Sequence, residues 1–240
     1  MEGEVYLVGH SHIDLSWLWP KGETIHEICP RTFRSVLKLL NTYPDFKFSQ
    51  SSAQVYEWME NYYPEIFGEI KKRVGEGCWE IVGGSWSEHN ATIPCGESLI
   101  RQYLFGKRYF MEKFGVDVKT AWLPDTFGFC WSLPQILKKC GIDYFLTYKL
   151  KWQIERMRPP IPFPYYLFWW QSPDGSKILA CHTVGSYNER LDHRYADSMM
   201  LSQLEELKRV HGIDQLLILF GLGDHGGGPT EDMIRRALEL

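Results

Sequence analysis

Short apolar strands that alternate with amphipathic helices constrain the fold of this chain more than any other feature of its sequence. Residues 5–8 form a short apolar run that ends at Gly9, and residues 216–220 form an entirely apolar run near the other end. Such runs are typical of strands buried on both faces of a sheet. Helical and strand-like patterns alternate between them. This order predicts an α/β fold with a mainly parallel sheet, either a barrel or an open sheet.

The alternation continues along the whole chain. The expected strands cover residues 5–8, 46–48, 79–82, 120–123, 143–147, 177–183 and 216–220. Apolar residues at helical spacing predict helices within residues 33–40, 66–74, 97–114, 133–140 and 201–210. In α/β folds, ligands bind at the carboxyl ends of the strands. Polar residues that directly follow an expected strand are therefore the first candidates for a functional site.

The composition suits a globular domain and argues against two classes of partner. The chain has 240 residues, which is long enough to bury a full core. Of these residues, 44% are hydrophobic and 23% are charged, as is ordinary for a globular protein. Its net charge of −4 provides no basic field to hold a nucleic-acid backbone. No apolar run approaches the roughly 20 residues needed to cross a bilayer. We therefore expect neither a nucleic-acid partner nor a membrane span.

The amino terminus and the cysteines indicate a cytoplasmic protein. The first four residues include two glutamates, and the amino terminus lacks the positively charged start, apolar stretch and cleavage site of a secretory signal. The six cysteines are scattered and contain no CxxC pair. In a chain of this length we expect them to be reduced and mostly buried.

Aromatic residues are unusually frequent. Ten Trp, 13 Tyr and 13 Phe make up 15% of the chain. Their flat apolar rings suit the faces of sugars, but a large aromatic core would account for them equally well.

A His-x-His-x-Asp motif directly follows the first expected strand. Residues two apart in an extended segment point the same way, so His10, His12 and Asp14 could face one pocket. Imidazole and carboxylate groups together are suitable ligands for zinc or a similar divalent ion. We favour metal binding by His12 and Asp14, with His10 as a structural, hydrogen-bonded histidine. A pocket that uses all three side chains is the alternative.

Two further acids stand after expected strands. Asp125 follows the strand at 120–123, between Pro124 and Gly128, which restrict the backbone. An Asp before a turn is most often a cap or turn residue, but this position at a strand end favours catalysis. Asp224 follows the strand at 216–220 in a glycine-rich segment that lets backbone approach a ligand. That segment lacks the Lys-Ser/Thr pair of a nucleotide site.

These segments together resemble the catalytic domain of glycoside hydrolase family 38, the α-mannosidases. The resemblance runs through nearly the whole chain and rests on HIDLSW at 12–17, GGSWSE at 83–88, PCGESLIRQ at 94–102, LPDTFGF at 123–129 and the glycine-rich segment at 221–230. It implies a barrel-like arrangement of the seven-stranded type with surrounding helices.

The resemblance also implies roles for individual residues. His12, Asp14 and Asp125 would ligate one zinc ion, and Asp125 would also be the nucleophile of a retaining glycosidase. Asp224 falls near the proposed general acid of the family. The residues expected to contact the sugar are Trp17, Phe127, Lys149 and, within 186–188, Tyr187. The substrate would be an α-mannoside or a mannose-containing oligosaccharide.

The chain departs from the family pattern in two places. Asn90 stands where family members commonly carry Asp, so a secondary contact is expected to differ. The fourth zinc ligand of the family is a His in a downstream helical domain, which β-rich domains follow. We expect residues 1–240 to be the N-terminal α/β catalytic domain, truncated before those domains. The fourth ligand would then be a water or a partner chain, with His89 and His225 as alternatives.

Two other functions remain open from the sequence. A metal-dependent carbohydrate deacetylase would use the same ligands but would activate a water on the metal. A catalytically inactive sugar-binding or partner-binding module would bind mannose without turnover. A face left uncovered by missing domains would favour a second subunit or a homo-oligomer.

Overall fold

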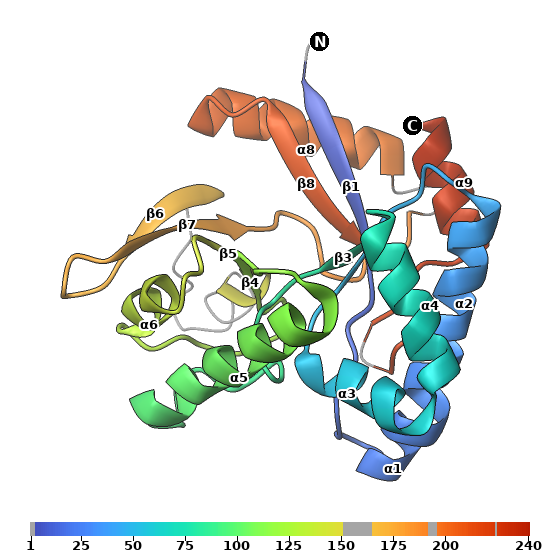
Figure 1. The fold of residues 1–240 in the computed structure, drawn as a ribbon. Coiled ribbons are helices and arrows are strands. Elements are labelled where there is room, and N and C mark those ends of the chain that lie inside the picture. The colour runs from blue at the N-terminus through green and yellow to red at the C-terminus, as the bar shows by residue number, and fades with distance from the viewer. Residues whose placement is uncertain (1–2, 151–164, 192–195, 224) are drawn as a thin grey trace.

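The computed structural model describes residues 3–150, 165–191, 196–223 and 225–240, and has a mixed α/β architecture (Figure 1). The described strands are β1 (Glu4–His10), β2 (Phe48–Gln50), β3 (Trp79–Ile81), β4 (Thr120–Trp122), β5 (Tyr144–Thr147), β6 (Leu167–Gln171), β7 (Lys177–His182) and β8 (Gln215–Phe220). They pair as two sheets of four strands, in the orders β3-β2-β1-β8 and β4-β5-β7-β6.

Both sheets are mainly parallel, as the sequence predicts. Every pairing in the first sheet is parallel, and its longest ladder joins β1 to β8 from Glu4↔Gln215 to Gly9↔Phe220. In the second sheet, β4, β5 and β7 run parallel, and only β6 is antiparallel to its neighbour β7. One closed barrel is not detected among these strands.

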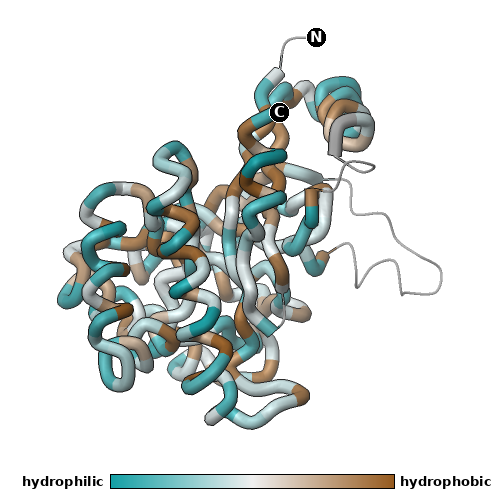
Figure 2. Tube along the Cα trace, turned by 90° about the vertical axis from the view of Figure 1, so that its right-hand side faces the viewer, coloured by the Kyte–Doolittle hydropathy of each residue, from teal (hydrophilic) through white to brown (hydrophobic). Residues whose placement is uncertain are grey.

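Helices cover the sheets on their outer sides (Figure 1). They are α1 (Lys21–Glu23), the π-helix η1 (Thr24–Ile28), α2 (Cys29–Thr42), α3 (Ala53–Tyr62), α4 (Pro64–Gly75), α5 (Gly96–Phe114), α6 (Leu133–Lys139), α8 (Ala196–His211) and α9 (Glu231–Glu239). Helix α4 packs against β3, α8 against β8, and α6 against β6 and β7. Hydrophobic and hydrophilic residues alternate along the helices in Figure 2, as expected of helices that bury one face.

A small buried cluster connects the two sheets. Trp122 of β4 and Leu146 of β5 pack there with Leu219 of β8 and with Val82, which follows β3. Two backbone hydrogen bonds also connect the first sheet to β4 and to the segment after β7. Gly83 N donates to Thr120 O at 2.8 Å, and Gly221 N donates to Glu189 O at 3.1 Å. The two sheets thus share one apolar layer, with β3 tied to the start of β4 and β8 tied to the segment that follows β7.

The structure corrects several expectations. The second strand begins at Phe48 rather than at Phe46, and neither α3 nor β6 is among the predicted elements. All six cysteines are free, as expected, but only Cys29 is fully buried and Cys95 is exposed. The prediction that the cysteines are mostly buried is therefore wrong. Among the described residues, no helix has both the length and the apolar character required to span a bilayer.

Candidate metal centre and active site

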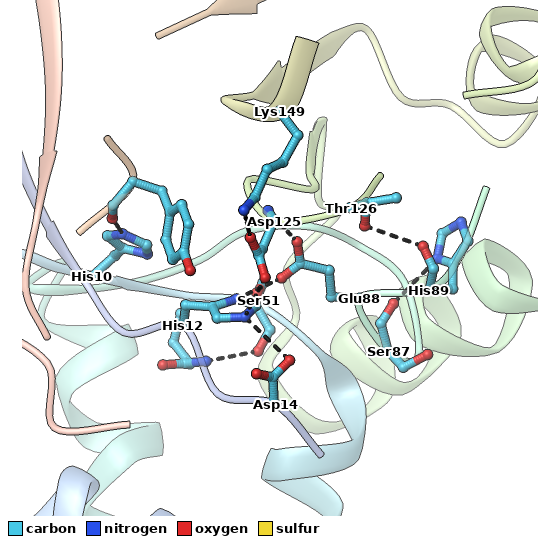
Figure 3. A network of polar contacts seen from close by, with 12 residues as sticks. His10, His12, Asp14, Ser51, Ser87, Glu88, His89, Asp125, Thr126 and Lys149 are labelled. Atoms are coloured by element: carbon cyan, nitrogen blue, oxygen red, sulfur yellow. Dashed lines mark hydrogen bonds and ion pairs between the residues drawn. The ribbon is translucent and has the colours of Figure 1, made fainter. Parts of the chain in front are cut away.

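Three potential metal ligands meet at the carboxyl ends of strands from different sheets. His12 and Asp14 lie just after β1, and Asp125 lies just after β4 (Figure 3). His12 Nε2 is 3.3 Å from Asp14 Oδ1 and 3.5 Å from Asp125 Oδ2. Each of the three residues offers one ligand atom, and these atoms lie within 4.8 Å of one another.

The chemistry of this group fits a divalent cation. His12 is buried, and its Nε2 has no hydrogen-bond partner among the described residues, although two carboxylate oxygens face it. An imidazole nitrogen that faces two carboxylate oxygens without a well-formed hydrogen bond to either is a position that a cation can fill. One nitrogen and two carboxylate oxygens form a donor set that zinc and related ions accept.

The electrostatics of the group are set by burial and by close opposite charges. Burial alone would lower the pKa of His12, but the charge of Glu88 and contacts with Asp14 outweigh it and hold the pKa well above its ordinary value. Burial raises the pKa of Asp125, and Lys149 and His12 offset part of that increase. A cation bound here would therefore compete with a proton on His12.

Lys149 and two aromatic rings enclose the other side of Asp125. Lys149 Nζ forms an ion pair with Asp125 Oδ1, and both side chains are largely buried. The same Nζ lies 4.6 Å from the ring centre of Phe127 and 5.3 Å from that of Tyr187. Tyr187 also meets the His12 ring edge-on at 5.2 Å. The structure thus brings Lys149, Phe127 and Tyr187 together around the predicted nucleophile.

Two predicted site residues are less closely tied to this group. Trp17 is exposed, and its ring meets that of Trp19 at 6.0 Å. Its role as a sugar contact stays a prediction. Asp224, the predicted general acid, lies outside the described residues.

The other histidines near the site do not join the three ligands. His10 is buried, its Nε2 bonds to the backbone oxygen of Tyr187, and its ring packs against Trp122. Burial lowers the pKa of His10 to about 4, so it is neutral near pH 7. This matches the structural reading of His10. His89 bonds to Ser87 O, and His225 pairs with Glu23 at 3.0 Å; neither belongs to the described ligand group.

Asn90, the departure from the family pattern, acts within its own turn. Its Oδ1 accepts hydrogen bonds from the backbone nitrogens of Thr92 and Ile93, each at 2.9 Å. These bonds fix the chain just before α5 rather than reaching the three ligands.

Glu88 is the site residue that the sequence analysis missed. Its Oε2 is 2.8 Å from His12 Nδ1, and its Oε1 accepts a hydrogen bond from Asp125 N at 2.7 Å. It follows β3, so the rule that placed the other candidates at strand ends could have identified it. The glycine pair at 83–84 separates it from the strand and conceals that relationship.

The family model and the curated relatives indicate the same family. The family model described as "Glycosyl hydrolases family 38 N-terminal domain" matches residues 2–240. Alpha-mannosidase G of Dictyostelium discoideum is 40% identical over 233 residues, which are 97% of this chain and 20% of the relative. Human alpha-mannosidase 2C1 is 37% identical over 98% of this chain and 22% of the relative.

A solved structure agrees with the family match. An alpha-mannosidase from Enterococcus faecalis V583 superposes with a TM-score of 0.81 at 26% identity, covering 100% of this chain and 27% of that one. The chain therefore spans about a fifth to a quarter of the length of these relatives.

Proposed function

The chain belongs to glycoside hydrolase family 38, and from this membership we propose that it contributes the active site of a retaining glycosidase that cleaves α-mannosidic linkages. The observation that carries the proposal is the position of Asp125. Its carboxylate lies at a strand end between the buried His12 and Lys149, beside exposed aromatic surface. The relatives named above are α-mannosidases, which supports mannosides as the substrate class.

The proposed reaction has two steps. An Asp125 oxygen attacks the anomeric carbon while the bond from that carbon to the leaving oxygen breaks, giving a covalent glycosyl-enzyme. A second carboxylic acid, for which we propose Asp224, gives its proton to the leaving oxygen. Asp224 then takes a proton from a water that attacks the anomeric carbon and releases Asp125. Retention requires the two carboxyl groups to be roughly 5–5.5 Å apart.

His12, Asp14 and Asp125 would hold one divalent cation, for which we propose zinc. When bound, the cation would supply positive charge that binds vicinal sugar hydroxyls and favours distortion of the ring. Lys149 keeps Asp125 paired and oriented through its contact with Oδ1. We propose that Phe127, Trp17 and Tyr187 line the subsite for the sugar, since aromatic rings suit its apolar faces.

We also propose that residues 1–240 act as the N-terminal α/β catalytic domain of a cytoplasmic enzyme. The apolar cluster shared by β4, β5 and β8 supports a barrel-like arrangement in which the two sheets are arcs of one assembly. A water or a partner chain would complete the coordination of the metal.

Hydrolysis of 4-nitrophenyl α-mannoside by the zinc-loaded protein tests the proposed function. We expect Asp125→Asn to lower kcat by about a thousandfold or more, since it removes the nucleophile. Asp143→Asn is the matched control, because Asp143 is paired with Lys138 away from the site. NMR of the first sugar released should show the α-anomer.

Three results would contradict this function. Folded, zinc-loaded wild type that releases no 4-nitrophenol but binds mannose would indicate a binding module. Release of acetate from an acetylated sugar, without hydrolysis of the mannoside, would indicate a deacetylase. Equal hydrolysis by wild type and Asp125→Asn would exclude Asp125 as the nucleophile.

A further inference from the structure

One largely buried carboxylate, that of Glu88, contacts both the histidine and the proposed nucleophile of the candidate site. The two oxygens of Glu88 have different partners. Oε2 lies 2.8 Å from His12 Nδ1, and Oε1 accepts the backbone N–H of Asp125 at 2.7 Å (Figure 3). The Glu88 side chain is 11% exposed, so these two bonds are made largely out of water.

The backbone that carries Glu88 is anchored before this residue. Gly83 and Gly84 turn the chain with φ values of 87° and 69°, which favour glycine. Beyond the turn, Trp86 N donates to Gln102 O of α5 at 2.8 Å, and Gln54 N of α3 donates to Trp86 O at 2.9 Å. The segment is thus fixed to two helices.

The backbone is anchored after Glu88 as well. Thr126 Oγ1 donates to His89 O at 3.2 Å, and Cys130 N donates to Ala91 O at 3.0 Å. The segments around Glu88 and Asp125 are therefore bound to each other on a rigid support, which is the arrangement that a precise site requires.

We propose that Glu88 is a positioning residue that orients His12 for metal binding and fixes Asp125 for attack. By accepting Nδ1–H, it leaves Nε2, the nitrogen that faces Asp14 and Asp125, to bind the cation when its proton is displaced. By accepting the N–H of Asp125, it sets the backbone from which the nucleophile projects. The kinetic part of this inference rests on the proposed function, while the part concerning the metal does not.

The geometry argues against two simpler roles for Glu88. It is not one of the described ligand group, and it bonds the ring nitrogen opposite to the one that faces the other carboxylates. Nor does Glu88 form an ordinary surface ion pair. One of its oxygens accepts a hydrogen bond from a backbone N–H, and both of its partners belong to the candidate site. An outer carboxylate of this kind fixes the tautomer and ring orientation of a metal-binding histidine.

The zinc affinity of Glu88→Gln tests this inference. Glutamine has the same shape but only one acceptor oxygen, so it can serve His12 Nδ1 or Asp125 N but not both. We expect the Kd for Zn²⁺, measured by chelator competition without any mannoside, to rise by about tenfold to a hundredfold. At saturating zinc we expect kcat to stay below the wild-type value while KM changes little, because Glu88 is directed at His12 and Asp125 N rather than at the sugar.

Glu60→Gln is the matched control. Glu60 also uses both oxygens, toward Lys113 and toward Tyr109 Oη, but it lies on α3 with both partners on α5 and does not belong to the ligand group. Its substitution should leave the zinc Kd within about twofold of wild type. Glu88→Asp keeps two acceptor oxygens on a side chain one methylene shorter, and its Kd should fall between those of wild type and Glu88→Gln.

The inference fails if folded Glu88→Gln binds zinc as tightly as wild type. If Glu88→Gln does not fold, an unchanged Kd in Glu88→Asp has the same meaning. If the kcat of Glu88→Gln equals the wild-type kcat at saturating zinc, Glu88 does not position Asp125. An inactive wild type would contradict the proposed function instead, and the comparison of zinc affinities would still decide the role of Glu88 toward His12.

Discussion

At the scale of single residues, the site gathers several acidic groups around a few basic ones. Asp14, Glu88 and Asp125 all lie within 3.5 Å of His12, and Lys149 pairs with Asp125 from the other side. Like charges this close repel one another unless cations balance them. The metal-free protein therefore needs the positive charges of His12 and Lys149 to keep the three carboxylates together. The close spacing of these acids lowers the stability of the fold, but the function of the site requires it.

Lys149→Met should destabilise the metal-free protein. The substitution leaves the Asp125 carboxylate buried without its cation, at a cost of about 2 kcal/mol, less than for a fully buried pair because both side chains keep some exposure. Urea denaturation of the metal-free protein measures this cost. Lys149→Arg keeps the charge and should lose less than half as much. Equal losses for the two variants would assign the effect to packing against Phe127 rather than to charge.

At the scale of elements, helix α5 must approach the segment that carries Glu88 very closely. A Cβ added at Gly106 would lie 2.5 Å from Gly84 O and against the carbonyl carbon of Ser85, closer than any real side chain comes. Because both neighbours are backbone, they cannot move aside as a flexible side chain could. Gly106 thus sets the spacing between α5 and the residues that precede Glu88.

Gly106→Ala should therefore destabilise the protein by about 3 kcal/mol or more, because α5 or the 84–86 backbone must shift. Gly68→Ala is the control in α4, where an added Cβ meets nothing within 4 Å. It should instead stabilise by about 0.5–1 kcal/mol through helix propensity. Urea denaturation of both variants distinguishes them, and a neutral Gly106→Ala would show that α5 is less tightly held than we infer.

Elements with regular spacing of apolar residues and a clear terminating residue could be predicted from the sequence. Helix α5 shows regular apolar spacing and ends at Gly115, whose φ of 71° suits a helix terminus. Helix α3 is hidden because Pro64 starts α4 directly after Tyr63, with no glycine between the two helices. Strand β6 (Leu167–Gln171) lies at a sheet edge and is antiparallel, and none of its residues is fully buried, so it lacks the buried apolar run by which the other strands are predicted.

The candidate ligands could also be predicted, because each directly follows a strand that is legible in the sequence. His12 with Asp14 follows β1, and Asp125 follows β4. Glu88 also follows a strand, β3, but the glycine pair at 83–84 separates it from that strand, so its relation to the strand end is harder to recognise. Its importance comes from contacts with His12 and with the backbone of Asp125, and these depend on how the two sheets meet. A local sequence pattern does not predict a contact between residues so far apart in the chain.

At the scale of the whole molecule, the candidate metal site takes its ligands from both sheets, whose described strands do not pair across from one sheet to the other. His12 and Asp14 extend from the β3-β2-β1-β8 sheet, and Asp125 extends from the β4-β5-β7-β6 sheet. The described backbone bonds between the sheets are few and lie near strand ends. A cation held by all three residues would therefore link the sheets and would be bound by the folded chain far more tightly than by the unfolded one.

Zinc should consequently stabilise the protein against urea. At a free concentration a hundred times the Kd, we expect a gain of about 2.7 kcal/mol in the free energy of unfolding. His12→Ala should abolish the gain, because it removes the nitrogen ligand. His89→Gln should keep it, because His89 contacts Ser87 and Tyr103 rather than the ligand group. Hydrogen exchange with zinc should slow both after β1 and after β4. Slowing confined to one sheet would mean that the cation does not bridge the two, even if the midpoint of unfolding rises.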